Sequence, residues 1–125
     1  MDESPFKGTT GLRRLWNAVG YSLHGFTSAF RHEDAFRQET LLAAVLIPTA
    51  LLLQVGGAGK AIMVASVVLV LIVELINSAI EAAVDRISLD HHRLSKRAKD
   101  IGSAAVFLSL VNVAAVWALV LFGSL

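Results

Sequence analysis

Three apolar runs alternate with polar segments along the chain, and each run predicts a helix that crosses a membrane. The predicted membrane helices cover residues 35–55, 61–84 and 101–122. Because a helix advances about 1.5 Å per residue, the second run is long enough to cross a hydrocarbon core of roughly 30 Å. The first run contains Pro48, which a spanning helix tolerates where neighbouring groups satisfy the freed carbonyl. The glycine-rich segment 54–60 is expected to form the turn between the first two helices.

The segment 11–33 has a different pattern, with apolar residues recurring every three or four positions and arginines on the remaining face. This periodicity predicts an amphipathic helix. Aromatic and apolar side chains backed by arginines suit a helix that lies in the membrane surface. A helix docked against another protein helix fits the same pattern and stays open as an alternative. Residues 1–10 are mostly polar and are expected to form a mobile tail.

Composition favours a membrane protein over a soluble one. Hydrophobic residues make up 55% of the 125 residues, and the charged 17% are segregated between the apolar runs. This pattern predicts one small all-α integral membrane domain over residues 1–125. The net charge of +1 gives no electrostatic argument for a nucleic-acid partner. The absence of cysteine excludes disulfides, thiol catalysis and cysteine metal sites, and the polar N-terminus predicts no cleavable signal peptide.

Basic residues are distributed unequally between the two sides of the predicted bundle. Lysines and arginines precede the first span and follow the second, whereas Lys60 is the only one in the turn between them. Short loops rich in lysine and arginine stay on the cytoplasmic side of a membrane. The N-terminus and the polar loop 85–99 are therefore expected in the cytoplasm, and the C-terminus outside.

The second apolar run carries polar residues where lipid would surround them. They recur at helical spacing, so they share one face of the helix, and they are Glu74, Asn77, Ser78, Glu81 and Asp85. An ionisable group near the centre of a membrane helix costs at least ~2.5 kcal/mol, and Glu74 lies about 10 Å deeper than Glu81 at helical rise. An intramembrane carboxylate of this kind indicates a functional site.

Two chemistries fit this pattern. Carboxylates next to lysine and arginine hold Mg²⁺ together with nucleotide phosphates, and phosphoryl transfer mainly needs positioning, charge neutralisation and a base for the attacking hydroxyl. Glu74 would then take a proton from an alcohol whose apolar chains stay in the lipid. A proton-coupled site in a small multidrug or ion transporter uses an intramembrane glutamate in the same way. The density of charged residues on the cytoplasmic side favours phosphoryl transfer over transport.

Two motifs resemble those of a known family. The element E-x-x-N-S-x-x-E covers residues 74–81, and the element A-K-D-x-G-S-A follows at 98–104. Together they closely resemble the small integral-membrane prokaryotic diacylglycerol kinases. Segments within residues 9–39 match the N-terminal motifs of the same family, so the resemblance extends over nearly the whole chain.

The resemblance implies a homotrimeric bundle in which each chain contributes a surface helix and three membrane helices, with active sites shared between neighbouring chains. It also implies ATP as phosphoryl donor and Mg²⁺ as cofactor. Glu74 is the implied general base, with Asn77 as a catalytic residue beside it, and the implied Mg²⁺ ligands are Glu33 and Glu81. The implied nucleotide contacts are Arg14, Tyr21, Glu33, Glu81, Asp90, His91, His92, Lys99 and Asp100. The implied contacts to the lipid substrate are Ser22, Glu39, Glu74 and Ser103.

The sequence therefore predicts a lipid kinase of a bacterial inner membrane. The predicted reaction converts 1,2-diacylglycerol to phosphatidic acid at the cytoplasmic face, in phospholipid recycling. Undecaprenol is the alternative acceptor within the resemblance. A small multidrug or ion transporter is the alternative from another class of protein.

Overall fold

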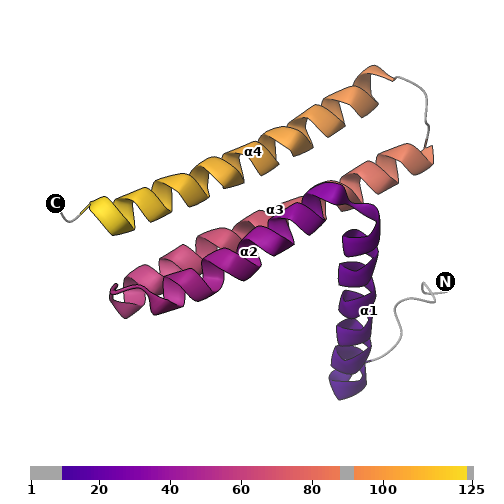
Figure 1. The fold of residues 1–125 in the computed structure, drawn as a ribbon. Helices are drawn as coiled ribbons and strands as arrows, with labels where there is room; N and C mark the ends of the chain where they lie inside the picture. Colours follow the sequence, from indigo (N-terminus) through magenta and orange to yellow (C-terminus); the bar gives the residue numbers. More distant parts are fainter. Residues whose placement is uncertain (1–9, 88–91, 124–125) are drawn as a thin grey trace.

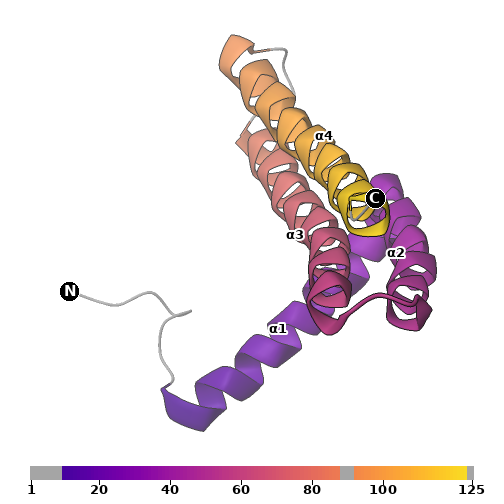
Figure 2. The same cartoon turned by 90° about the vertical axis from the view of Figure 1, so that its left-hand side faces the viewer.

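The computed structural model describes residues 10–87 and 92–123, and these residues form four α-helices with no strand among them. The helices are α1 (Gly11–His32), α2 (Asp34–Leu52), α3 (Gly57–Ile87) and α4 (Arg93–Phe122). Helices α2 and α4 both pack along α3, whereas α1 leaves this group at a steep angle (Figure 1). Figure 2 shows the same projection of α1 from the side. The predicted tail lies almost wholly outside the described residues.

Three of the helices, α2, α3 and α4, are long and apolar enough to cross a membrane. The fourth, α1, is amphipathic and almost entirely exposed along its length. The predicted fold class, an all-α membrane protein with an N-terminal amphipathic helix and three membrane helices, is therefore confirmed.

Helices α3 and α4 are longer than a membrane requires. They contain 31 and 30 residues, which extend about 45 Å at helical rise, against roughly 30 Å of hydrocarbon. α3 begins at Gly57, inside the segment predicted as a turn, and runs on past the end of its apolar stretch. The polar ends of both helices therefore extend beyond the hydrocarbon core.

Residues 85–87 and 93–99 of the polar segment predicted as a loop are helical, since α3 extends into its beginning and α4 starts within it. The His92 side chain caps α4 through Nδ1, which accepts a hydrogen bond from the Leu94 backbone N–H at 3.0 Å. Lys96 and Asp100, one turn apart on α4, form an ion pair at 2.6 Å. The polar side chains of this segment argue against burial in lipid, but they do not argue against a helix. The cap and the ion pair stabilise the first turns of α4.

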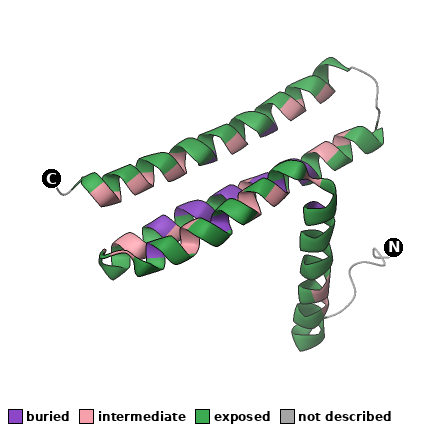
Figure 3. Ribbon diagram, viewed as in Figure 1, coloured by how far each residue is buried: buried purple, intermediate pink, exposed green. Residues whose placement is uncertain are grey.

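Burial is concentrated on α3 (Figure 3), whose buried residues are Met63, Ser66, Val67, Val70, Glu74, Asn77 and Ser78. Within the described chain, α4 buries only Gly102 and Ser109. Trp117 Nε1 of α4 donates to the Met63 carbonyl of α3 at 3.3 Å. Membrane helices associate through small residues and interhelical hydrogen bonds of this kind, so most large apolar side chains remain on the outside of the bundle.

The lysine of the turn between α2 and α3 has a structural contact. Lys60 Nζ donates a hydrogen bond to the Leu51 carbonyl at 2.8 Å. Leu51 lies in the last turn of α2, where carbonyls lack partners within the helix and where a cation is favoured. Lys60 therefore caps the end of α2 from the first turn of α3.

Replacing Lys60 with methionine removes this cap and keeps an apolar side chain of similar length. We expect the free energy of unfolding in detergent micelles to fall by about 1 kcal/mol, because one hydrogen bond contributes on that order. Lys60→Arg still donates to the carbonyl and should retain wild-type stability. Equal thermal unfolding of the methionine variant and the wild type would contradict the capping role.

Candidate functional site

The polar residues predicted on one face of α3 do share a face, and their burial changes along it. Glu74, Asn77 and Ser78 are buried, with 5%, 7% and 9% of their surfaces exposed. Glu81 is half-buried and Asp85 is exposed. The face therefore runs from the interior of the bundle out to its polar end.

Four carboxylates from three parts of the chain gather near the buried end of this face. Glu74 and Glu81 belong to α3, Glu39 to α2, and Glu33 to the link between α1 and α2. The charges of Glu33 and Glu81 act on the Glu74 carboxyl, and the charge of Glu74 acts on Glu39. Like charges repel one another, so this carboxylate cluster favours a bound cation.

Asn77 connects the carboxylate cluster to α4. Its Nδ2 atom donates to Glu81 Oε1 at 3.2 Å, one turn along α3. On the other side, Gly102 of α4 passes so close that an added Cβ atom would lie 2.0 Å from Asn77 Oδ1. A small residue lets two membrane helices approach closely, and at this contact the absent side chain leaves the room that the Asn77 amide occupies.

Several buried polar atoms in this region have no hydrogen-bond partner within the described residues. They are Glu39 Oε2, Thr40 Oγ1, Asn77 Oδ1 and Ser78 Oγ. A buried polar atom without a partner costs about 1–3 kcal/mol, and native proteins leave few of them. Such a group of atoms indicates a place that a polar ligand, water or another chain completes.

A cavity of about 580 Å³ opens between α1 and α3 beside the carboxylate cluster. Its polar lining comes from Ser22, Ser28, His32 and Glu33 on the α1 side and from Ser78 on α3. The remaining lining residues are glycine, alanine, leucine and phenylalanine. A mostly apolar cavity of this size with a few polar groups is typical of a small-molecule site.

Basic residues at the polar end of the bundle have acidic partners. Lys99 Nζ pairs with Asp85 Oδ1 at 2.6 Å, which joins the start of α4 to the end of α3. The charge of Glu81 also acts on Lys99. Lys96 and Asp100 form the second pair. Exposed ion pairs contribute little to stability. The pair with Asp85, however, keeps the Lys99 ammonium group near the carboxylate cluster.

Other residues predicted for the site lie elsewhere in the single chain. Arg14 and Tyr21 are exposed on α1, Ser103 is exposed on α4, and none of the three lines the 580 Å³ cavity. His92 is exposed and caps α4. Two more of the predicted residues lie outside the described part of the chain, and they are Asp90 and His91.

Sequence reasoning placed Ser78 on the polar face but gave it no role in the site, and it left Ser28, His32 and Thr40 out of the site. His32 and Ser78 line the cavity, and Thr40 carries one of the unpartnered hydroxyls. Ser78 follows Glu74 by one helical turn, and this spacing is a signal in the sequence. His32 and Thr40 carry no comparable signal, because only the packing of α1 and α2 brings them to this region.

The described residues contain no group of three or more histidine, cysteine, aspartate or glutamate side chains arranged to hold a metal ion. Mg²⁺, however, is usually held by only one or two carboxylates together with phosphate oxygens and water. Glu33 and Glu81 supply two carboxylates near Glu74. The residues present therefore fit a magnesium ion that reaches the site with a nucleotide.

The fold and this site define a small α-helical membrane protein with a carboxylate cluster set into its membrane helices. A family model described as prokaryotic diacylglycerol kinase matches residues 20–121. The chain belongs to the prokaryotic diacylglycerol kinase family. The family predicted from the two sequence motifs is thus confirmed.

Relatives with this name match nearly the whole chain. A diacylglycerol kinase of Pseudomonas aeruginosa is 59% identical over 98% of this chain and 100% of its own length. One of Haemophilus influenzae is 50% identical over 91% of this chain and 97% of its own length. One of Escherichia coli K12 is 44% identical over 91% of this chain and 93% of its own length.

The close contact between Gly102 and Asn77 leads to a prediction. Gly102→Ala forces the Asn77 amide away from its position, so we expect the free energy of unfolding to fall by about 1–3 kcal/mol, as overpacking usually causes. Gly20→Ala is the matched control, because a Cβ atom there has no neighbour within 4 Å.

The measurement is thermal unfolding of both variants in the same detergent. A Gly102→Ala protein as stable as the Gly20→Ala protein would mean that the Asn77 amide turns aside from this contact at little cost. In that case Asn77 would not be held by α4.

Proposed function

We propose that this protein is an ATP- and Mg²⁺-dependent lipid kinase. It transfers the γ-phosphoryl group of ATP to the free hydroxyl of 1,2-diacylglycerol, which gives phosphatidic acid for phospholipid recycling. The reaction takes place at the cytoplasmic face of a bacterial inner membrane, with the N-terminus in the cytoplasm. The observation that carries the proposal is the buried Glu74 on a polar face that leads out to further carboxylates. Membership of the diacylglycerol kinase family supports it.

Glu74 is the proposed general base. It lies in the part of α3 that is buried among apolar residues, where an alcohol can present its hydroxyl while its acyl chains remain in lipid. The carboxylate takes the hydroxyl proton as the oxygen attacks the γ-phosphorus, and the bond from that phosphorus to the bridging oxygen of ADP breaks. Asn77 holds the neighbouring Glu81 carboxylate through its amide at 3.2 Å, which makes it the positioning group of the site.

Glu33 and Glu81 are the proposed Mg²⁺ ligands. When bound, the ion neutralises phosphate charge and orients the phosphate oxygens. The two carboxylates come from different elements, one from the α1–α2 link and one from α3. The charges of both carboxylates reach the Glu74 carboxyl. A metal-bound triphosphate held by them would therefore present its γ-phosphoryl group next to the base.

The nucleotide is proposed to bind at the polar end of the bundle. Lys99 supports this assignment, because it is fixed by Asp85 and lies near enough to Glu81 for their charges to interact. A lysine there offers a point charge for phosphate. The remaining proposed nucleotide contacts are Arg14, Tyr21, Asp90, His91, His92 and Asp100.

The lipid is proposed to approach Glu74 past three further polar residues. Ser22 lines the 580 Å³ cavity, and Glu39 carries an unpartnered carboxyl oxygen in the bundle. Ser103 lies on the exposed face of α4, one residue after the contact with Asn77. A mostly apolar cavity with a few polar groups suits a substrate with one hydroxyl and two acyl chains.

A homotrimer with shared active sites accounts for groups that one chain leaves incomplete. Arg14 and Tyr21 are exposed on α1, away from the cavity beside Glu33 in the same chain. The unpartnered buried atoms near Glu74 call for groups from outside the chain. If α1 of one chain covers the site of its neighbour, Arg14 and Tyr21 reach a nucleotide and the unpartnered atoms gain polar groups in the same assembly.

The test of the proposed function is a phosphorylation assay of the purified protein in mixed micelles, with labelled ATP and with diacylglycerol and undecaprenol offered side by side. We expect phosphatidic acid as the main product. Preferential labelling of undecaprenol would favour the alternative acceptor. If neither lipid is labelled while the reconstituted protein moves protons or a cationic drug across vesicles, the chain is a transporter instead.

Glu74→Gln is expected to lower the turnover of diacylglycerol by at least a hundredfold, because general base catalysis contributes roughly 10²–10⁴-fold. The glutamine keeps the size and polarity of the side chain, so the unfolding temperature should stay close to that of the wild type. The measurement is the same labelled-ATP assay, with thermal unfolding as the control. Robust turnover by a folded Glu74→Gln protein would remove Glu74 as the base.

Glu33→Ala and Glu81→Ala are each expected to shift the Mg²⁺ concentration for half-maximal activity upward by about tenfold or more, because each variant removes one of only two protein ligands. Titration of Mg²⁺ at saturating diacylglycerol measures this shift. Glu3→Ala, in the N-terminal segment, is the control and should leave the titration unchanged. An unaltered Mg²⁺ dependence in both ligand variants would argue against the metal assignment.

A further inference from the structure

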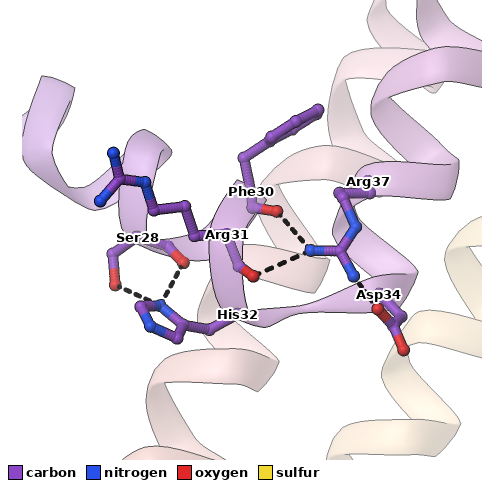
Figure 4. Close-up of polar contacts among 6 residues, drawn as sticks. All are labelled: Ser28, Phe30, Arg31, His32, Asp34 and Arg37. Carbon is purple, nitrogen blue, oxygen red and sulfur yellow. Dashed lines mark hydrogen bonds and ion pairs between the residues drawn. The ribbon is translucent and has the colours of Figure 1, made fainter.

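One guanidinium group joins the last turn of α1 to the first turn of α2 (Figure 4). Arg37 Nη1 donates hydrogen bonds to the carbonyl oxygens of Phe30 at 2.8 Å and Arg31 at 2.9 Å. Its Nη2 atom forms an ion pair with Asp34. The Arg37 side chain thus reaches back from α2 across the corner and binds the end of α1 and the start of its own helix together.

Helix ends explain why this contact is favourable. The last carbonyls of a helix have no partner within it, and a positive charge near them is stabilised by the helix dipole. Asp34, in the first turn of α2, is favoured at that end for the opposite reason. The planar guanidinium has several donors in a fixed arrangement, so one side chain serves both helix ends at once.

The corner that Arg37 holds contains a single residue. Glu33 has an extended backbone, with φ −117° and ψ 107°, and it is both the C-cap of α1 and the N-cap of α2. Its N–H donates to the Ala29 carbonyl at 2.9 Å, and its own carbonyl accepts from the Arg37 backbone N–H at 3.2 Å. Ala29 and Phe36 are buried on either side of it. The direction of the Glu33 carboxyl therefore depends on the angle between α1 and α2.

We propose that Arg37 is a positioning residue that sets the α1–α2 angle and thereby aims the Glu33 carboxylate at the neighbourhood of Glu74. The clamp itself follows from the hydrogen bonds, whereas its effect on metal and nucleotide binding rests on the proposed function. Within residues 10–87 and 92–123, no side chain donates a hydrogen bond to the Glu33 carboxylate. The region that the carboxylate can reach is therefore set by its backbone, and the backbone is set by the corner.

The first experiment measures the corner without reference to activity. The chain has no cysteine, so cysteines introduced for the exposed residues Leu23 on α1 and Val45 on α2 carry the only spin labels. Labelled protein diluted with excess unlabelled protein reports distances within one chain. The wild type should give a narrow distance distribution, and Arg37→Gln should give a broad or shifted one.

Arg31→Gln is the matched control. It removes the same charge from the same corner, but Arg31 takes part in the clamp only through its backbone carbonyl, so its distance distribution should equal that of the wild type. Arg37→Lys keeps the charge and loses the fork-shaped arrangement of donors, so it should also broaden the distribution. Distributions for Arg37→Gln and Arg37→Lys that match the wild type would overturn the clamp.

The second experiment measures what the clamp does for the reaction. In Arg37→Gln the Mg²⁺ concentration for half-maximal activity and the KM for ATP should rise about tenfold or more, as loss of a residue that orients a metal ligand usually causes. The KM for diacylglycerol should stay the same. A raised KM for diacylglycerol with unchanged Mg²⁺ dependence would mean that Arg37 contacts the lipid, which overturns the positioning role.

The two experiments separate the inference from the proposed function. A wild-type protein that phosphorylates no lipid would refute the kinase assignment, while the spin-label distances would still decide whether Arg37 holds the corner. A broadened corner with an unchanged Mg²⁺ titration would refute the link from Arg37 to Glu33 and leave the kinase assignment in place.

Discussion

Glu74 lies in a helix whose neighbouring positions are valine, leucine and isoleucine, and an ionisable group near the centre of such a helix costs at least ~2.5 kcal/mol. The surrounding residues lower this cost by giving Glu74 polar neighbours and by shielding it from lipid. Asn77 and Ser78 extend the polar surface one turn further, and Gly102 brings α4 into contact with it. Glu39 approaches from α2. The packing of the membrane helices is thus arranged around a polar interior that lipid does not solvate.

The polar face of α3 links two environments. Its inner end is buried between apolar helices, and its outer end at Asp85 is exposed and paired with Lys99. A lipid hydroxyl is available only from the membrane side, and a nucleotide only from the aqueous side. A single helix with buried residues at one end of a polar face and exposed residues at the other allows both reactants to meet along it, which is the basis of the proposed kinase mechanism.

Helix α1 matters to this arrangement through its junction with α2. Only Glu33 separates the two helices, and the Arg37 guanidinium holds their ends together. A short junction transmits any change in helix angle directly to the residue within it. The same helix forms one wall of the 580 Å³ cavity and carries exposed polar residues along its outer side. The sequence of α1 makes it amphipathic, and the angle between α1 and α2 makes it part of the candidate site.

Periodicity and apolar length determined which segments are helices and which of them are able to cross a membrane, because burial in lipid demands long apolar runs with internally satisfied backbones. Helical spacing also determined that Glu74, Asn77 and Ser78 share a face, and the two motifs determined the family. The loop prediction for 85–99 was wrong at 85–87 and 93–99, which belong to α3 and α4. The roles of Arg37, His32 and Gly102 were decided only by tertiary structure, since each depends on a contact with another helix or a helix end. Such contacts arise from packing angles, which no local spacing encodes.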